Sequence, residues 1–100
     1  MAHKTRAIVI HEKDTVAVAL EALPAGTEVA VGIGEAVEKI RLASPIPVGH
    51  KFALLDIPKD VPVIKYGEPI GLSTAPIARG EHVHVHNLLG QNQGRKGDLS

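Results

Sequence analysis

Three histidines occur at alternate positions in the segment GEHVHVHNL, and they are the residues best suited to chemistry. If this segment is a β-strand, His82, His84 and His86 share one face, because successive side chains on a strand alternate. Val83 and Val85 would then face the core. Same-face neighbours lie about 6.6 Å apart along a strand, so two imidazoles can converge on one metal ion at about 2.0–2.1 Å. A straight strand therefore predicts a His-x-His pair rather than three ligands.

The residues beside these histidines extend the candidate site. Asn87 adds an amide that can orient a hydroxyl or a carboxylate. A carboxylate ligand would have to come from elsewhere, because Glu81 would point to the same side as the valines. The alternative is an exposed strand face that is merely rich in histidine and binds nothing.

Two further segments offer cationic groups to an anionic ligand. His50 and Lys51 follow Gly49 at the entrance to a predicted strand, where the imidazole can donate a hydrogen bond and the ammonium supplies a point charge. Lys65 and Tyr66 lie in a glycine-containing turn. Solvated turns are the alternative for both segments. Because the chain has no Gly-x-Ser-x-Gly elbow and no phosphate-binding loop, these groups favour acid–base or metal-assisted work on a small, oxygen-rich anion.

The composition excludes several classes of function. The 100 residues carry 11 basic and 11 acidic side chains, which indicates one small domain and gives no charge excess for binding nucleic acid or a membrane. The absence of cysteine excludes disulfides and thiolate metal ligands. No apolar run approaches the roughly 18 residues of a membrane span, and the start is too short for a signal peptide, so we expect a cytoplasmic protein.

We expect the elements that position these groups to be mainly short strands. The β-branched segment 7–11 predicts a buried first strand. Alternating apolar and polar residues predict a strand over 27–33, a turn at Gly34 and Glu35, and a returning strand over 36–42. We interpret this pair as an exposed hairpin, which needs another layer to pack on.

One segment has the spacing of a helix. Apolar residues recur at i, i+3, i+4 and i+7 from Val16, and Asp14 is a suitable N-cap, which predicts a short helix over 15–23 that Pro24 ends. The other six prolines forbid a long helix and confine pairing to short or edge strands. We find no internal repeat and no second domain.

Four segments carry a resemblance to a known family. DTVAVALEAL, PVGHKFALLDI, VIKYGEPIG and GEHVHVHNL, in this order, resemble the small subunit or N-terminal domain of altronate and galactarate dehydratases. The small subunit of sulfolactate sulfo-lyase is similar. The resemblance implies an antifreeze-like SAF domain of the β-clip type, mainly β, with short strands, many Pro/Gly turns and one or two short helices. We therefore expect an SAF domain over 1–89 and a flexible polar tail over 90–100.

The resemblance also implies a function and its residues. It implies a hydro-lyase component that is inactive without a larger catalytic chain, in which a sugar acid loses water by β-elimination and a divalent metal, iron or manganese, steadies the enediolate. The large chain would hold much of that metal site. Carried over to this sequence, it implies substrate binding by His50, Lys51, Lys65, Tyr66 and Asn87, catalysis by His84 and His86, and metal binding by His82, His84 and His86.

One position departs from the family pattern, and two other interpretations stay open. The family usually has an asparagine where this chain has Thr15, so the start of the predicted helix offers no side-chain amide. A stand-alone SAF module that binds a small anion or a metal without catalysis is the second interpretation. The third is an interaction protein whose histidines line a wet interface.

Overall fold

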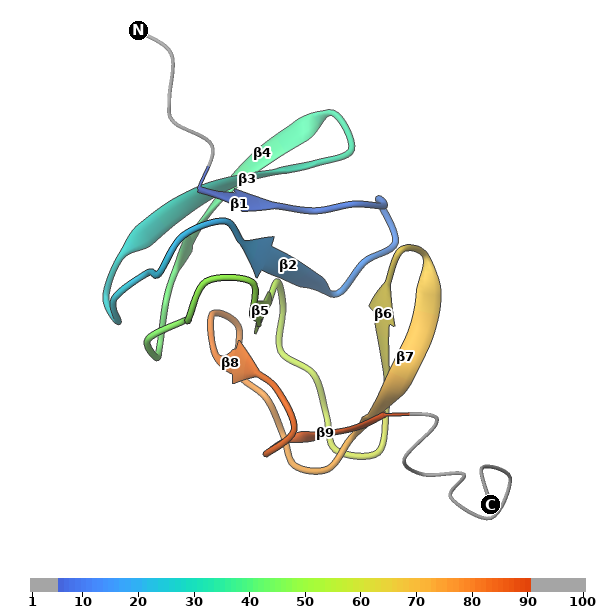
Figure 1. The fold of residues 1–100 in the computed structure, drawn as a ribbon. Helices are drawn as coiled ribbons and strands as arrows, with labels where there is room; N and C mark the ends of the chain where they lie inside the picture. The colour runs from blue at the N-terminus through green and yellow to red at the C-terminus, as the bar shows by residue number, and fades with distance from the viewer. Residues whose placement is uncertain (1–5, 91–100) are drawn as a thin grey trace, which may run out of the picture.

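The computed structural model describes residues 6–90, which form nine strands and no helix (Figure 1). The mainly β fold predicted from the sequence is therefore confirmed. In chain order the strands are β1 (Ala7–Ile8), β2 (Val16–Ala19), β3 (Glu28–Ile33), β4 (Ala36–Arg41), β5 (Lys51–Ala53), β6 (Pro62–Lys65), β7 (Glu68–Ser73), β8 (His82–Val83) and β9 (Leu88–Gly90).

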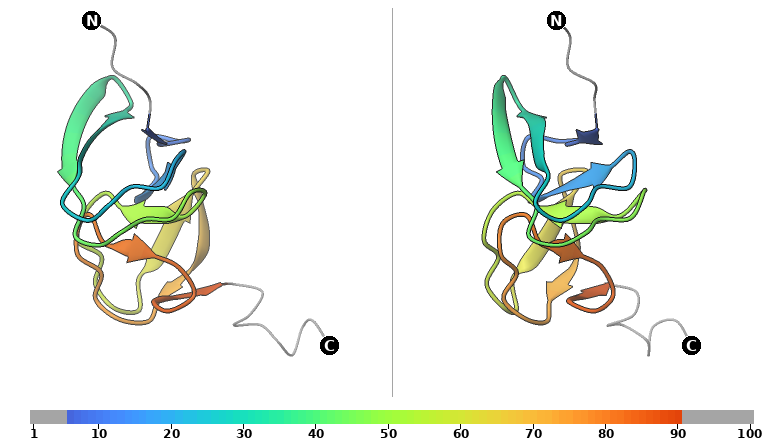
Figure 2. Two further views of the ribbon diagram at one scale, coloured as in Figure 1. Left: turned by 60° about the vertical axis from the view of Figure 1, so that its left-hand side comes forward. Right: turned by 90° about the vertical axis from the view of Figure 1, so that its left-hand side faces the viewer.

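The strands build three antiparallel sheets. A four-stranded sheet has the order β1-β2-β5-β8, β3 and β4 form a two-stranded sheet, and the third sheet has the order β6-β7-β9. The views in Figures 1 and 2 place the four-stranded sheet between the β3–β4 hairpin and the β6–β7 hairpin. Strands β5 and β8, which carry candidate site residues, are neighbours in this central sheet.

The central sheet buries side chains on both faces. Ala17 and its partner Phe52 belong to a core cluster that includes residues of β3 and β4. Val16 and its partner Ala53 belong to a second cluster, which includes Val63 of β6. Because successive residues of β2 and β5 enter different cores, these strands hold the two halves of the domain together.

The predicted hairpin over 27–42 is confirmed, with β3 and β4 paired from Glu28↔Arg41 to Ile33↔Ala36. Val29 and Val31 are buried while the alternate residues are exposed, as the period of two predicts. The first predicted strand, 7–11, is shorter than expected, because only Ala7 and Ile8 pair with β2.

The predicted helix over 15–23 is wrong, because its central part is strand β2. Val16 to Ala19 pair with β1 on one side and with β5 on the other, so their backbone groups are used in two ladders. Leu20, which the helical face would have buried, is 46% exposed. Alternating valine and alanine suit a strand buried on both faces, and this tertiary pairing overrides the helical spacing.

Asp14 is buried, but it caps no helix. Its carboxylate accepts hydrogen bonds from the backbone N–H of His11 at 3.0 Å and of Gly67 at 2.8 Å. Next to it, the Thr15 hydroxyl accepts a hydrogen bond from the N–H of Ile64 at 3.0 Å. Asp14 and Thr15 thus fix the β6–β7 hairpin beside the start of β2.

A turn with the same pattern recurs four times, which the sequence analysis missed. Each copy starts with a buried apolar residue and has a residue with positive φ three positions later. The four positive-φ residues are Gly26 (84°), Gly49 (81°), Asp60 (65°) and Gly80 (85°). The buried residues pair across the molecule as isolated bridges, Leu23 with Ile46 and Ile57 with Ile77. Glycine, or aspartate in one copy, serves here because side chains disfavour positive φ.

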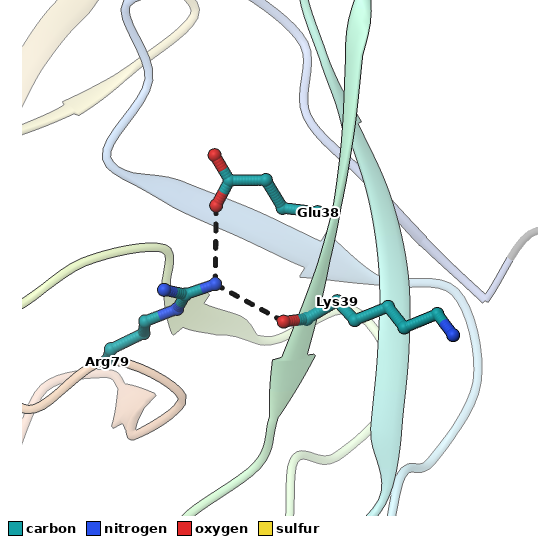
Figure 3. Close-up of polar contacts among 3 residues, drawn as sticks. All are labelled: Glu38, Lys39 and Arg79. Atoms are coloured by element: carbon teal, nitrogen blue, oxygen red, sulfur yellow. Dashed lines mark hydrogen bonds and ion pairs between the residues drawn. The ribbon is translucent and has the colours of Figure 1, made fainter.

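Arg79 ties the turn before β8 to the β3–β4 hairpin. Its guanidinium donates to the Glu38 carboxylate at 3.3 Å and to the Lys39 carbonyl at 3.2 Å (Figure 3). Beside it the chain passes so closely that a Cβ on Gly80 would meet the Arg41 carbonyl oxygen at 2.2 Å. The approach of two backbones, more than the exposed ion pair, fixes this turn.

The end of the described chain bears on the predicted domain boundary. Gly90 is the last residue of β9, and the boundary predicted at residue 89 stays a prediction. The predicted tail from 91 onward lies outside the described residues. No helix long and apolar enough to cross a membrane occurs between residues 6 and 90.

Candidate metal and substrate site

A cluster of histidine rings forms where β5 and β8 meet. The Nδ1 atom of His50 lies 2.9 Å from Nε2 of His82, although 32 residues separate them in the chain. The His84 ring stacks on that of His50, with centroids 4.1 Å apart. One potential ligand atom from each of His50, His82 and His84 lies within 4.8 Å of the others, and all three residues are half-buried.

The predicted straight strand over 81–87 is wrong beyond Val83. Strand β8 contains only His82 and Val83, and the chain then turns, with the Asn87 N–H donating to the His84 carbonyl at 3.0 Å. Val83 is fully buried as predicted, but Val85 is 68% exposed, because the turn carries it away from the core. The turn also brings the rings of His82 and His84 to within 5.5 Å of each other, centroid to centroid.

Asn87 holds this turn with a buried side-chain amide that is only 3% exposed. Its Oδ1 accepts from the His84 N–H at 3.0 Å, and its Nδ2 donates to the His82 carbonyl at 2.8 Å. Both amide atoms are therefore bonded to the backbone of the two histidines. Asn87 positions the histidines, and the substrate contact predicted for it stays a prediction.

His86 lies at the exposed side of the cluster. Its ring is 5.1 Å from that of His82, centroid to centroid, and tilted by 32°. Among residues 6–90, the histidine triplet whose ligand atoms come together is His50, His82 and His84, not the predicted His82, His84 and His86.

Lys51 adds positive charge beside the histidines, and Lys65 lies near enough to Lys51 to affect its charge. Burial lowers the pKa of Lys51 below its ordinary value of 10.5, and the nearby charge of Lys65 lowers it further. The ion pairs between side chains of residues 6–90 join Arg6 to Glu21 and Arg79 to Glu38, and neither lysine takes part in them. A carboxylate from outside would relieve this repulsion, so an anionic ligand suits the site.

Two imidazoles of the cluster, those of His82 and His84, disfavour their protonated forms. Burial lowers the pKa of His82 below 6.5, and His86, His50, His84 and Lys51 lower it further. Burial, followed by His50, Lys51 and His86, lowers the pKa of His84. Both rings are therefore neutral at pH 7, and each has one nitrogen lone pair available to accept a proton or bind a metal ion.

Tyr66 lies in the two-residue turn between β6 and β7. Tyr66 and Gly67 have φ values of 59° and 73°, as a type I′ hairpin turn requires. The Tyr66 side chain is 57% exposed, and the ammonium of Lys65 lies 4.6 Å from its ring centroid. The structure thus pairs Tyr66 with Lys65 and does not bring its ring into contact with the histidine rings.

The contribution of His50 to the ring cluster escaped the sequence analysis, which assigned it only to substrate. Its signal was present in the repeated turn, since Gly49 and Gly80 are equivalent positions that each lead into a strand of the central sheet. Two shallow apolar grooves lie over the isolated bridges, one lined by Leu23 and Ile46 and the other by Ile57 and Ile77. Neither groove contains a candidate site residue.

Fold and site together define a small all-β domain that presents histidine and lysine side chains around the meeting point of β5 and β8. Residues 5–91 match the family described as the altronate/galactarate dehydratase SAF domain. The chain belongs to this family, and the SAF class implied by the sequence is confirmed.

Three relatives are similar to parts of this chain. The chain is 52% identical over 80 residues to altronate dehydratase of Escherichia coli, covering 80% of this chain and 15% of that protein. It is 40% identical over 78 residues to the Escherichia coli galactarate dehydratase (L-threo-forming), covering 76% of this chain and 14% of that protein. It is 54% identical over 43 residues to (2R)-sulfolactate sulfo-lyase subunit alpha of Chromohalobacter salexigens, covering 43% of this chain and 46% of that subunit. The chain thus spans about one seventh of the two dehydratases.

Proposed function

We propose that this chain is the SAF component of a sugar-acid hydro-lyase of the altronate/galactarate type, acting in the cytoplasm with a larger catalytic chain or domain. Two observations together support the proposal. Residues 5–91 match the family, and the aligned region makes up only 15% of the length of a dehydratase relative. A domain that is one part of a larger enzyme, and that presents unpaired cationic groups, is suited to complete an active site.

In this proposal Lys51 anchors the substrate carboxylate, and Lys65 strengthens the local positive potential. Within residues 6–90, neither lysine forms an ion pair with a carboxylate. A hydroxy-carboxylate substrate would supply this negative charge and reduce the repulsion between them. Fixing the carboxylate aligns the adjacent C–H bond with the group that removes its proton. His50 immediately precedes Lys51, Tyr66 immediately follows Lys65, and both side chains can donate to substrate hydroxyls.

The histidines serve the proton transfers. In dehydration, the C–H bond next to the carboxylate breaks and its electrons form the new C=C bond, while the β-hydroxyl departs with a proton as water. While it binds no metal ion, His84 can take the proton, because its lowered pKa keeps the ring mainly neutral at pH 7. His86, at the exposed edge and outside the triplet of converging ligand atoms, can exchange a proton with the substrate in either case. A divalent metal, when bound, would supply Lewis-acid stabilisation of the enediolate.

The proposal is tested by a chimera in which this chain replaces the SAF region of the Escherichia coli altronate dehydratase, to which it is 52% identical. We expect the chimera to form keto-acid from altronate and the same enzyme without any SAF region to be impaired. Lys51→Met should raise KM more than it lowers kcat, while Lys59→Met, in a turn outside the cluster, should change neither. Full activity without an SAF region would refute the proposal.

The sulfo-lyase relatives favour a second candidate. The chain is 41% identical over 49 residues to (2R)-sulfolactate sulfo-lyase subunit alpha of Paracoccus pantotrophus, covering 73% of that chain. That relative is a subunit of a sulfo-lyase, so elimination of sulfite from sulfolactate is an alternative reaction. Assaying altronate, galactarate and sulfolactate side by side separates these substrates.

A stand-alone SAF module is a further alternative. It predicts that the isolated chain binds a sugar acid with measurable affinity, whereas a component that only completes a site binds it weakly. Calorimetric titration of the isolated chain with altronate and galactarate distinguishes the stand-alone module from the enzyme component.

A further inference from the structure

We propose that His50, His82 and His84 form a three-imidazole site for a divalent transition-metal ion of the zinc or iron(II) type. The ion's role in catalysis rests on the proposed function, but its binding does not, because all three ligands belong to this chain. The set differs from the three histidines that the family resemblance implies, since His50 replaces His86.

The backbone of each ligand is fixed before any ion binds. His50 lies in a turn. Its backbone N–H donates to the Pro47 carbonyl at 3.0 Å, and its carbonyl accepts from the Ala19 N–H at 2.9 Å. The N–H of His82 donates to the Ser44 hydroxyl at 2.9 Å. Asn87 binds both His82 and His84, at 2.8 and 3.0 Å. Only the imidazole torsions are left to adjust.

The ring positions require a small adjustment. Nitrogens bound to one ion at about 2.0–2.1 Å lie about 2.9 Å apart at right angles and about 3.3 Å apart in a tetrahedron. His50 and His82 already have nitrogens at 2.9 Å. The ligand atoms of the triplet lie within 4.8 Å of one another, so His84 must turn from its stacked position to bring its nitrogen closer.

The donor set selects the class of ion. Three imidazole nitrogens suit zinc, iron(II), cobalt and nickel, whereas calcium, magnesium and manganese prefer oxygen ligands. Of the two metals that the family resemblance implies, this set favours iron. Three neutral ligands leave the ion's charge uncompensated and a coordination position open, which an anion can fill beside Lys51.

Calorimetric titration of the untagged full chain with zinc tests the proposal. We expect one zinc per chain, more than about tenfold weaker binding in His50→Ala, His82→Ala and His84→Ala, and little change in His86→Ala. His3→Ala and His11→Ala are controls for other imidazoles, and magnesium should not bind. His50→Phe keeps a stackable ring but removes the nitrogens, so it separates ligation from folding, which circular dichroism monitors for every variant.

Two results would overturn the proposal. One is the absence of zinc binding at sub-millimolar concentrations, and the other is loss of binding in His86→Ala with retention in His50→Ala or His50→Phe. Imidazole NMR signals that shift selectively for His50, His82 and His84 would support it. None of these readouts involves dehydration, so failure of the metal site and failure of the chimera are observed separately.

Discussion

His50 Nδ1 and His82 Nε2 lie 2.9 Å apart, close enough that one proton lies between them. One ring must donate and the other must accept, so the pair cannot carry a proton on both of these nitrogens. This contact joins β5 to β8 through their side chains, and it links the state of the histidine cluster to the stability of the domain.

Acidification should destabilise the fold. The pKa values of His82 and His84 are lowered in the folded chain, so the unfolded chain binds more protons as the pH falls through about 6.5. The unfolding free energy should therefore be highest above that pH and fall below it. Urea unfolding between pH 8 and pH 5 measures this, and His82→Gln/His84→Gln should flatten the dependence. An equally steep dependence in that variant would contradict the assignment.

Asn87→Ala should destabilise the domain by about 2 kcal/mol, because it leaves the His84 N–H and the His82 carbonyl without their partner. Asn87→Asp keeps the acceptor and loses the donor, so an intermediate loss is expected. Thermal unfolding gives both values. A loss no larger than that of an exposed substitution such as Lys59→Ala would show that water replaces the amide.

Two equivalent glycines should respond differently to alanine. Gly26 and Gly80 have φ values of 84° and 85°, but an added Cβ meets nothing within 4 Å at Gly26 and the Arg41 carbonyl oxygen at 2.2 Å at Gly80. Gly26→Ala should cost about 1 kcal/mol from its backbone conformation alone, and Gly80→Ala should cost several times more. Chemical denaturation of the pair tests this, and equal losses would rule out the clash.

Lys65→Met should raise the pKa of Lys51 toward 10.5, because it removes a nearby like charge. NMR titration of the lysine Nζ groups measures the change directly. Lys39→Met is the matched control, since Lys39 lies on β4 and is exposed. An unchanged pKa in Lys65→Met would mean that burial alone depresses it.

Part of this fold follows from local sequence. Alternation in 28–33 predicts the buried Val29 and Val31, and the flanking turn residues predict the β3–β4 hairpin. The prolines and glycines predict short strands and frequent turns, and the order of four motifs indicates the family that residues 5–91 match. These features depend on neighbours in the chain, so they can be predicted without knowledge of the fold.

Other features depend on contacts between segments that are distant in the chain. Val16 to Ala19 satisfy a helical spacing, yet they form the strand that lies between β1 and β5. His82, His84 and His86 satisfy a strand spacing, yet the chain turns after Val83, where Asn87 holds it. His50 joins the ring cluster although 32 residues separate it from His82. Whether these segments form a helix, a strand or a turn depends on their pairing partners and on the buried Asn87 amide, which local spacing does not specify. The physical reason is that backbone groups must find partners throughout the fold, and those partners are distant in sequence.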